Sequence, residues 1–154
     1  MPRVILADDD VLLREGLATL LERSGYEVVG QAADGTELVD LTRRHAPDMV
    51  LVDIRMPPTQ TQEGLDAARS IREAWPGIGI LPLSAHADVD QAMDLLAGGP
   101  RTGYLLKQRV TDVDEFLRTL ARIAAGECVV DPALVQELVF AQRATDPLAE
   151  LTAR

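Results

Sequence analysis

The chain has 154 residues, of which 47% are hydrophobic, and carries a formal net charge of −10. This length suits one globular domain with a short extension, and the acidic balance excludes a chain that binds nucleic acid by itself, because phosphate contact requires a basic face. The single cysteine, Cys128, excludes an internal disulfide and is typical of a reducing compartment. The sequence shows neither the apolar region of a signal peptide nor an apolar run long enough to span a membrane, so we expect a cytoplasmic protein.

Short apolar runs alternate with amphipathic segments along most of the chain. The predicted strands cover residues 4–7, 27–32, 49–52, 78–83 and 103–106. The predicted helices lie near residues 12–23, 35–45, 64–75, 88–96 and 111–125. Thr111 is expected to cap the last of these helices. Continuous apolar strands that alternate with helices predict an α/β fold, in which a doubly wound parallel sheet carries helices on both faces.

The pattern changes after residue 126. A further helix is expected to begin at Asp131-Pro132, and one of its faces should be formed by Leu134, Leu138 and Val139. The polar stretch that follows is typical of a linker. We therefore expect one domain over residues 1–126, followed by a linker helix and connection over residues 127–154.

Polar residues stand at the ends of four predicted strands. They are Asp8 and Asp9, Asp53, Ser84 and Lys107. Open parallel sheets bind ligands at the carboxyl ends of their strands, so these side chains should gather there. Three close carboxylates repel one another unless a cation joins them, and Mg²⁺ prefers carboxylates together with a phosphate oxygen. Such a set suits phosphoryl transfer, in which one carboxylate attacks phosphorus while the cation, ammonium and hydroxyl hold the phosphoryl oxygens.

Lys107 stands out because it is the only lysine among fifteen basic residues, the rest being arginines. A sequence that favours arginine so strongly would supply arginine wherever any positive charge sufficed. Lysine offers a compact point charge that can pair with a carboxylate or a phosphoryl oxygen. The position of this lysine therefore supports a phosphoryl site.

Four short segments carry a resemblance to a known family. They are LADDD (6–10), LVDIRMP (51–57), LSA (83–85) and GYLLK (103–107). None is specific alone, but in their order and spacing they resemble the receiver domain of two-component response regulators, over about residues 1–126. The resemblance implies a flavodoxin-like, CheY-like fold with five parallel strands in the order 2-1-3-4-5.

The resemblance also implies a role for each acidic residue. Asp53 would be the phosphoacceptor. Asp8 and Asp9 would form the acidic pair that holds Mg²⁺, together with Asp53 and the backbone carbonyl of Arg55. The phosphoryl donor would be the phosphohistidine of a sensor histidine kinase.

Three further residues would respond to the phosphoryl group. Ser84 would be the switch hydroxyl that turns toward it, and Lys107 would be its ionic partner. Tyr104 matches the aromatic residue of the family's switch. The domain is expected to take up and release the phosphoryl group without turnover of an independent substrate.

The form GYLLK, without a proline after its lysine, is closest to the LuxR/NarL branch of the family, in which a helix-turn-helix DNA-binding domain follows the receiver. Residues 146–154 resemble the connection to that domain, so we expect an isolated receiver that lacks it. On this reading the chain forms a homodimer on activation, reaches DNA only through the missing domain and contacts no membrane. Two departures from the family stand out, an enlarged loop at 58–63 and a longer turn at 98–102.

Alternative interpretations stay open. Asp10 is expected to cap a helix rather than bind metal, and Tyr104 can be a strand residue packed in the core. Asp8-x-Asp10 mimics the motif of haloacid-dehalogenase-type phosphatases, although Leu12 stands where they usually carry Thr or Val. A flavodoxin-like FMN module would need a phosphate loop, and three aspartates would repel that phosphate. A receiver-like interaction module that phosphorylation does not regulate is a further alternative.

Overall fold

The structure, a computed structural model, describes residues 1–56, 63–97 and 99–145. Strands and helices alternate along this described part of the chain. The strands are β1 (Arg3–Ala7), β2 (Glu27–Ala32), β3 (Met49–Asp53), β4 (Gly79–Ser84), β5 (Gly103–Leu106) and β6 (Val129–Val130). The helices are α1 (Val11–Arg23), α2 (Gly35–His45), α3 (Glu63–Ala74), α4 (Val89–Leu96), the 3-10 helix η1 (Lys107–Thr111), α5 (Val113–Ala124) and α6 (Pro132–Thr145).

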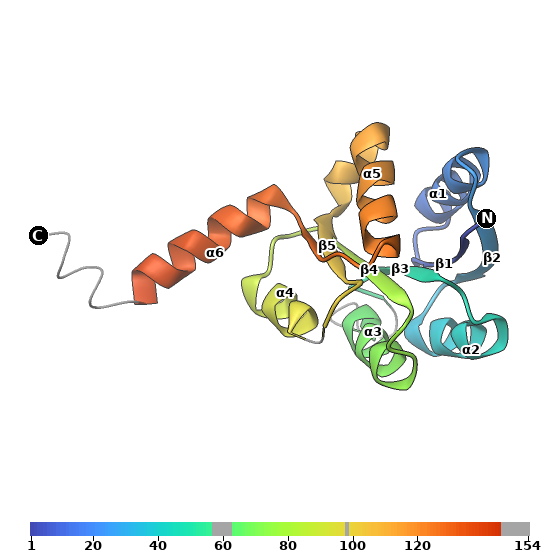
Figure 1. The fold of residues 1–154 in the computed structure, drawn as a ribbon, viewed down its shortest axis with the longest axis horizontal. Helices are drawn as coiled ribbons and strands as arrows, with labels where there is room; N and C mark the ends of the chain where they lie inside the picture. The colour runs from blue at the N-terminus through green and yellow to red at the C-terminus, as the bar shows by residue number, and fades with distance from the viewer. Residues whose placement is uncertain (57–62, 98, 146–154) are drawn as a thin grey trace, which may run out of the picture.

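Helices cover both faces of one parallel sheet. Figure 1 shows α1 and α5 on one face and α2, α3 and α4 on the other. Successive residues of a strand point to opposite faces. Val4 and Leu6 therefore join the core under α1 and α5, whereas Ile5 and Ala7 join the core on the opposite face. Because both faces are covered, the central strands β3 and β4 are buried along their whole length, whereas β2 at the edge is mostly half-buried.

The strand order is β2-β1-β3-β4-β5-β6. The predicted α/β fold and the predicted order of the first five strands are confirmed, and a sixth strand extends the sheet. β1 lies between β2 and β3 and pairs in parallel with both. The connection after β1 therefore leads to one side of this strand, and the connection after β2 leads to the other side. The strand order reverses at this point, where such folds bind ligands. Ala7 pairs with Val52, so the residues that follow β1 and end β3 are neighbours.

The sixth strand is a short addition that the sequence interpretation missed. Val129 pairs with Gly103, and Val130 pairs with Tyr104. Two residues are too few to produce a periodic signal, so the strand exists because β5 offers an open edge. The placement of a domain boundary at residue 126 stays a prediction.

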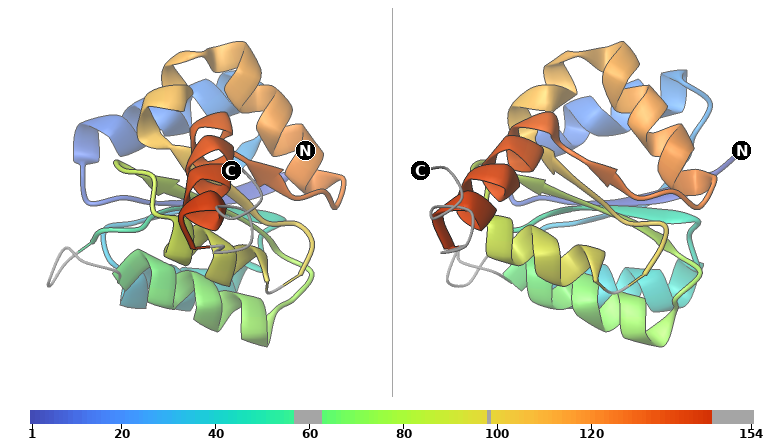
Figure 2. Two further views of the ribbon diagram at one scale, coloured as in Figure 1. Left: turned by 90° about the vertical axis from the view of Figure 1, so that its left-hand side faces the viewer. Right: turned by 60° about the vertical axis from the view of Figure 1, so that its left-hand side comes forward.

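Helix α6 begins after Asp131, as expected, and runs alongside α4 before it extends away from the sheet (Figure 2). Leu134 is fully buried in the core, whereas Val139 is 46% exposed. The side chain of Leu138 lies outside the described residues, as do residues 146–154 that resemble a linker. The predicted face of Leu134, Leu138 and Val139 therefore stays a prediction, and Leu134 is the buried hydrophobic residue among the described side chains of α6.

The prediction that Thr111 caps the fifth helix is also wrong. Residues 107–111 form η1, and the Thr111 hydroxyl donates to the carbonyl of Gln108 over 2.8 Å. Asp112 caps α5 instead, since its carboxylate accepts the N–H of Glu115 over 3.2 Å. A carboxylate one residue later offers a charged acceptor to the positive end of the helix.

The two predicted departures from the family lie at the edge of what the structure describes. The loop at 57–62 is outside the described residues, and so is Gly98. In the described part of the turn, Arg72 donates to the Thr102 hydroxyl and, over 2.9 Å, to the carbonyl of Pro100. None of the described helices combines the length and apolar character that a membrane crossing requires.

Burial of Leu134 predicts that α6 contributes to the stability of the whole domain. Leu134→Ala should lower the free energy of unfolding by about 2–4 kcal/mol, because it leaves a cavity in the core. Phe140→Ala on the same helix is the matched control, because that side chain is 72% exposed and its loss should change the value by less than about 0.5 kcal/mol. Urea unfolding measures both. Equal stability of Leu134→Ala and the wild type would show that α6 is not part of the cooperative unit.

Candidate functional site

Three carboxylates meet where β1 and β3 end. Asp8 and Asp9 follow β1, Asp53 is the last residue of β3, and their ligand oxygens lie within 4.8 Å of one another. Asp8 and Asp53 are 3% and 4% exposed, whereas Asp9 faces solvent. The structure therefore brings together the three acidic residues that the sequence predicted.

Asp10 has a different role from its neighbours. Its carboxylate accepts the N–H of Leu13 over 3.2 Å and caps α1, while its own N–H donates to Asp8 Oδ1 over 2.9 Å. The expected helix cap is confirmed.

The only lysine of the chain reaches two of the carboxylates. Lys107 Nζ donates to Asp53 Oδ2 over 2.9 Å and lies 3.4 Å from Asp8 Oδ2. Lys107 begins η1 directly after β5, so it projects from the carboxyl end of the sheet like the aspartates. The predicted convergence of Lys107 on Asp53 is thus found in the structure.

Burial raises the pKa of Asp53 from 3.8 to about 6. The hydrogen bond from Lys107 opposes this shift, and the charge of Asp8 adds to it. Burial also lowers the pKa of Lys107, but its hydrogen bond to Asp53 and the charges of both aspartates outweigh burial, so its pKa lies above the ordinary value. Lys107 is therefore an ammonium at neutral pH, and Asp53 is a carboxylate that is costly to keep ionised.

The site fits a small divalent cation. Three carboxylates face a single ammonium, which leaves an excess of negative charge. Asp8 Oδ2 is buried and accepts no hydrogen bond among the described residues, although the Lys107 ammonium lies 3.4 Å from it. A buried charged oxygen in that state is unfavourable unless an ion or water satisfies it. Hard oxygen ligands of this kind are those that Mg²⁺ prefers.

Arg55 lies next to this cluster through its backbone. Its N–H donates to Asp53 Oδ1 over 3.3 Å, and its side chain is exposed. The hydrogen bond is a minor cause that lowers the pKa of Asp53. A ligand role for the Arg55 carbonyl stays a prediction.

Ser84 and Tyr104 meet at one backbone carbonyl. Ser84 Oγ donates to the carbonyl of His86 over 2.6 Å and accepts the His86 N–H over 3.2 Å. Tyr104 Oη donates to the same carbonyl over 3.4 Å, and its side chain is fully buried. The His86 carbonyl, which sequence reasoning did not single out, therefore joins the two predicted switch residues. The His86 side chain is exposed, as expected.

Gly64 was also missed, although it packs directly on the end of β3. A Cβ built at Gly64 would lie 1.8 Å from the carbonyl oxygen of Asp53. The Gly64 N–H donates to the carbonyl of Ile54 over 2.9 Å. Only glycine allows α3 to approach β3 this closely. The sequence signal was a lone glycine at a predicted helix start, which does not reveal what it touches.

Arg14 ties the acidic turn to the neighbouring strand. Its guanidinium donates to the carbonyl of Asp8 over 2.7 Å, to the carbonyl of Ala32 over 3.4 Å and to Gln31 Oε1 over 3.1 Å. These bonds join the ends of β1 and β2 to α1. Sequence reasoning missed Arg14 because a single arginine on a helix is ordinarily a surface residue.

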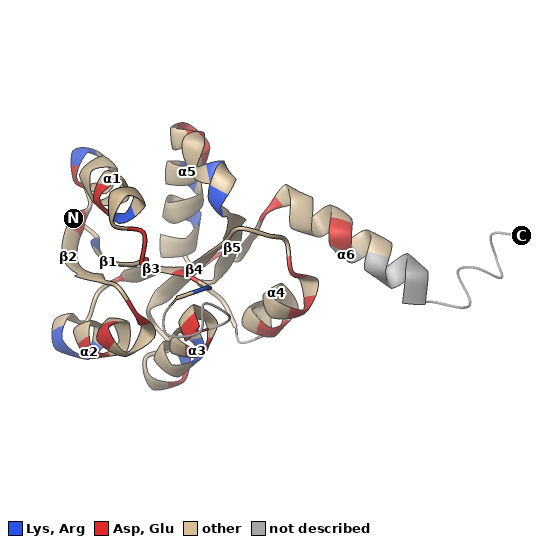
Figure 3. Ribbon diagram, turned by 180° about the vertical axis from the view of Figure 1, so that it is seen from behind, with Lys and Arg blue, Asp and Glu red and all other residues tan. Residues whose placement is uncertain are grey.

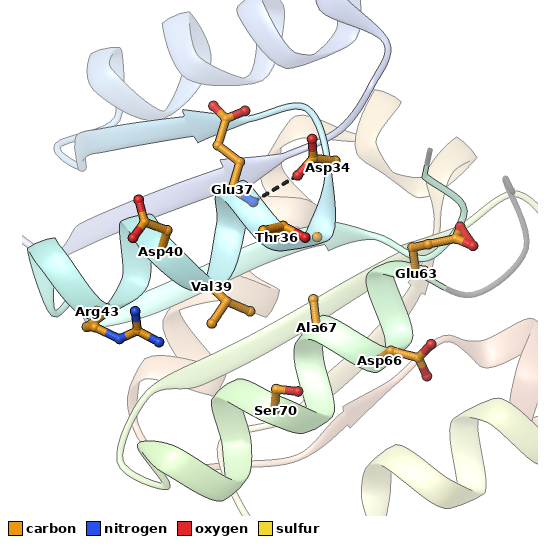
Figure 4. Close-up of a pocket in the computed structure, with 11 residues that line it drawn as sticks. Asp34, Thr36, Glu37, Val39, Asp40, Arg43, Glu63, Asp66, Ala67 and Ser70 are labelled. Carbon is orange, nitrogen blue, oxygen red and sulfur yellow. Dashed lines mark hydrogen bonds between the residues drawn. The ribbon is translucent and has the colours of Figure 1, made fainter. Parts of the chain in front are cut away.

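A separate groove lies between α2 and α3 (Figure 4). It has a volume of ≈ 920 Å³, and its lining includes Asp34, Thr36, Val39, Asp40, Arg43, Glu63 and Asp66. None of the predicted site residues lines it. The Asp34 carboxylate at its end is already bound, since it accepts the N–H of Glu37 over 2.8 Å. The groove is thus separate from the acidic site at the carboxyl end of the sheet.

Basic and acidic residues occur on the same helices. Figure 3 shows lysine and arginine residues on several helices, interspersed with acidic ones. The formal net charge of the chain is −10.

Comparison with known proteins places the chain in a family. Residues 4–120 match the response regulator receiver domain. The transcriptional regulatory protein DegU of Brevibacillus brevis is 31% identical over 138 residues, which are 89% of this chain and 56% of that protein. The oxygen regulatory protein NreC of Staphylococcus carnosus (strain TM300) is 30% identical over 138 residues, which are 89% of this chain and 61% of that protein. The chain thus spans less than two thirds of these relatives.

A solved structure agrees with the fold. The two-component response regulator of the LuxR family from Aurantimonas sp. SI85-9A1 has a TM-score of 0.79 and 31% identity, and the match covers 92% of this chain and 98% of that one. The sequence resemblance to receivers is thereby confirmed. The chain belongs to the response regulator receiver domain family, and it is a receiver domain of a two-component response regulator whose relatives include LuxR-family proteins.

Proposed function

We propose that Asp53 takes up a phosphoryl group from the phosphohistidine of a sensor histidine kinase, and that Mg²⁺ is required. The observation that carries this proposal is the contact of the chain's only lysine with both Asp53 and Asp8 beside the acidic cluster. A buried carboxylate with an adjacent ammonium and a cation site has what phosphoryl transfer needs, which is positioning and charge neutralisation.

The reaction divides between the described residues. An oxygen of Asp53 attacks phosphorus, the phosphorus–nitrogen bond of the phosphohistidine breaks, and the imidazole keeps the electron pair. Lys107 then exchanges its bond to Asp53 Oδ2 for one to a phosphoryl oxygen. Asp8, Asp9, Asp53 and the Arg55 carbonyl would hold Mg²⁺. When bound, that ion neutralises charge on the phosphoryl oxygens.

The response would pass through the His86 carbonyl. Ser84 now donates to this carbonyl over 2.6 Å and would release it on turning toward the phosphoryl group. Tyr104 would then become the stronger donor to the same oxygen, because its present bond is long at 3.4 Å. Ser84 and Tyr104 would therefore move as a pair through one shared acceptor.

The output of this switch is proposed from relatives. DegU is named a transcriptional regulatory protein, and NreC an oxygen regulatory protein. We propose a transcription-regulating output for a protein that contains this domain, with homodimerisation on activation and DNA contact through a helix-turn-helix domain. The receiver unit would end near residue 126, in a cytoplasmic protein with no turnover of an independent substrate.

Labelling tests the phosphoacceptor. With Mg²⁺ and acetyl phosphate, the wild type should gain one acid-labile phosphoryl group by intact mass, and Asp53→Asn should gain none. Asp66→Asn, which changes an exposed carboxylate on α3, is the control and should label like the wild type. Labelling should disappear when a chelator removes Mg²⁺. An unlabelled wild type, or a labelled Asp53→Asn, would contradict the proposal.

Gly64→Ala tests the contact between α3 and the phosphoacceptor strand. A Cβ at 1.8 Å from the Asp53 carbonyl must displace the strand end or the helix, so the variant should lose at least about 2 kcal/mol of stability and should label more slowly. Gly16→Ala is the matched control, since its Cβ would meet nothing within 4 Å and alanine favours a helix. Urea unfolding and labelling rates measure both variants. Equal behaviour of the two would contradict the close contact.

The raised pKa of Asp53 predicts how the stability of the metal-free protein, kept so by a chelator, depends on pH. Between pH 4 and 6 the folded state binds more protons at Asp53 than the unfolded state, because the pKa rises from 3.8 to about 6 on folding. As the pH rises from 4 to 6, the unfolding free energy of the wild type should therefore fall by roughly 1–3 kcal/mol relative to that of Asp53→Asn. Thermal and urea unfolding at pH 4 and pH 7 test it. A constant difference between the two proteins at both pH values would refute the shift.

A further inference from the structure

A second buried carboxylate lies away from the acidic cluster, at the junction of β6 and α6. Asp131 is fully buried, yet neither the sequence interpretation nor the proposed reaction uses it. Its Oδ2 accepts the N–H of Leu106 and the Nε of Arg109, both over 3.1 Å, and its Oδ1 accepts the N–H of Ala133 over 2.9 Å. A charge without solvent access is tolerated only with such full compensation.

These contacts lie on both sides of Lys107. Leu106 directly precedes the lysine, and Arg109 follows it by two residues. The N–H of Asp131 also donates to the carbonyl of Tyr104 over 2.8 Å. One residue therefore holds three points of the corner between β5 and η1 from which the Lys107 side chain departs.

The geometry explains why a carboxylate is needed at this position. The Asp131 N–H continues the ladder between β5 and β6 by one step. Its carbonyl cannot continue that ladder, because it accepts the N–H groups of Leu134 and Val135 over 2.9 and 3.2 Å in α6. The side-chain oxygen takes the Leu106 N–H in place of the backbone carbonyl. The chain can thus change from strand to helix without leaving a buried N–H unpaired.

The reach of Lys107 to Asp53 depends on this corner. Lysine has a long flexible side chain, and its position is defined only where its backbone is fixed. β5 has four residues, and its last, Leu106, pairs with Ser84 of β4. Asp131 holds the same residue from the opposite side through the Leu106 N–H. Displacement of the corner would move the ammonium relative to the 2.9 Å contact with Asp53.

We propose that Asp131 is a positioning residue for the phosphorylation reaction, which fixes the corner that carries Lys107 and joins it to the first turn of α6. The inference rests on the proposed phosphorylation of Asp53. The Asp131 carboxylate also accepts the Ala133 N–H at the start of α6, so the same residue caps this helix.

The test compares three variants of the full chain. Asp131→Ala removes every acceptor of the carboxylate, and Asp131→Asn keeps an oxygen for the Leu106 N–H but loses the charge that faces Arg109. Leu134→Ala loosens α6 without touching these contacts. Labelling with Mg²⁺ and acetyl phosphate should slow on the order of tenfold or more in Asp131→Ala, slow less in Asp131→Asn and stay near the wild-type rate in Leu134→Ala.

A second readout separates positioning from a loss of stability. Isotope-labelled lysine reports on Lys107 alone, because the chain has no other lysine. The NMR signal of its Cε in the protein without phosphoryl donor should shift in Asp131→Ala, return toward the wild-type value in Asp131→Asn and stay unchanged in Leu134→Ala. Urea unfolding should show that Leu134→Ala is less stable than the wild type although its labelling rate and lysine signal are unchanged.

The outcomes are distinguishable from those of the proposed function. A labelled wild type together with wild-type rates and lysine signals in Asp131→Ala would overturn the positioning role and leave the phosphorylation of Asp53 intact. If Asp131→Ala does not fold, the labelling rate of Asp131→Asn decides, and a wild-type rate in that variant would overturn the inference. A wild type that takes up no phosphoryl group would overturn both the proposed phosphorylation of Asp53 and the positioning role of Asp131.

Discussion

The ion pair between Lys107 and Asp53 is the interaction on which the rest of the site depends. Two aspartates are almost fully buried where β1 and β3 end, and buried charges persist only when they are compensated. Lys107 lies within 3.4 Å of both and compensates them in part. The remaining negative charge makes the site suited to a cation, and the cation in turn makes it suited to an anionic phosphoryl group.

The backbone around this pair is held by contacts that carry no reactive chemistry. Gly64 lets α3 approach the carbonyl of Asp53, and Arg14 joins the ends of β1 and β2. Asp131 holds the corner of β5 that carries Lys107. Each of the charged groups thus projects from a rigid element whose end is tied to a neighbour. Preorganisation of this kind reduces the reorganisation that charge neutralisation would otherwise require.

Two routes lead outward from the site. One runs through the His86 carbonyl, where Ser84 and Tyr104 share an acceptor on the way to α4. The other runs through Asp131 to α6, which packs alongside α4. Both routes therefore reach the side of the molecule where α4 and α6 lie together (Figure 1). If Asp53 is phosphorylated as proposed, the side formed by α4 and α6 is where both sets of contacts end.

The sequence by itself determined the α/β fold and the gathering of Asp8, Asp9, Asp53 and Lys107, and its resemblance to receivers implied the order of the first five strands. Continuous apolar strands and polar residues at their ends are local signals, and a parallel sheet turns them into one site. The tertiary structure alone decided the sixth strand, the cap at Asp112, and the roles of Gly64, Arg14 and Asp131. Each of these depends on a neighbour distant in the chain: an open sheet edge for Val129, the Asp53 carbonyl for Gly64, and the Leu106 N–H for Asp131. Residues of that kind have no pattern of their own, because their partners are brought to them only when the sheet has formed.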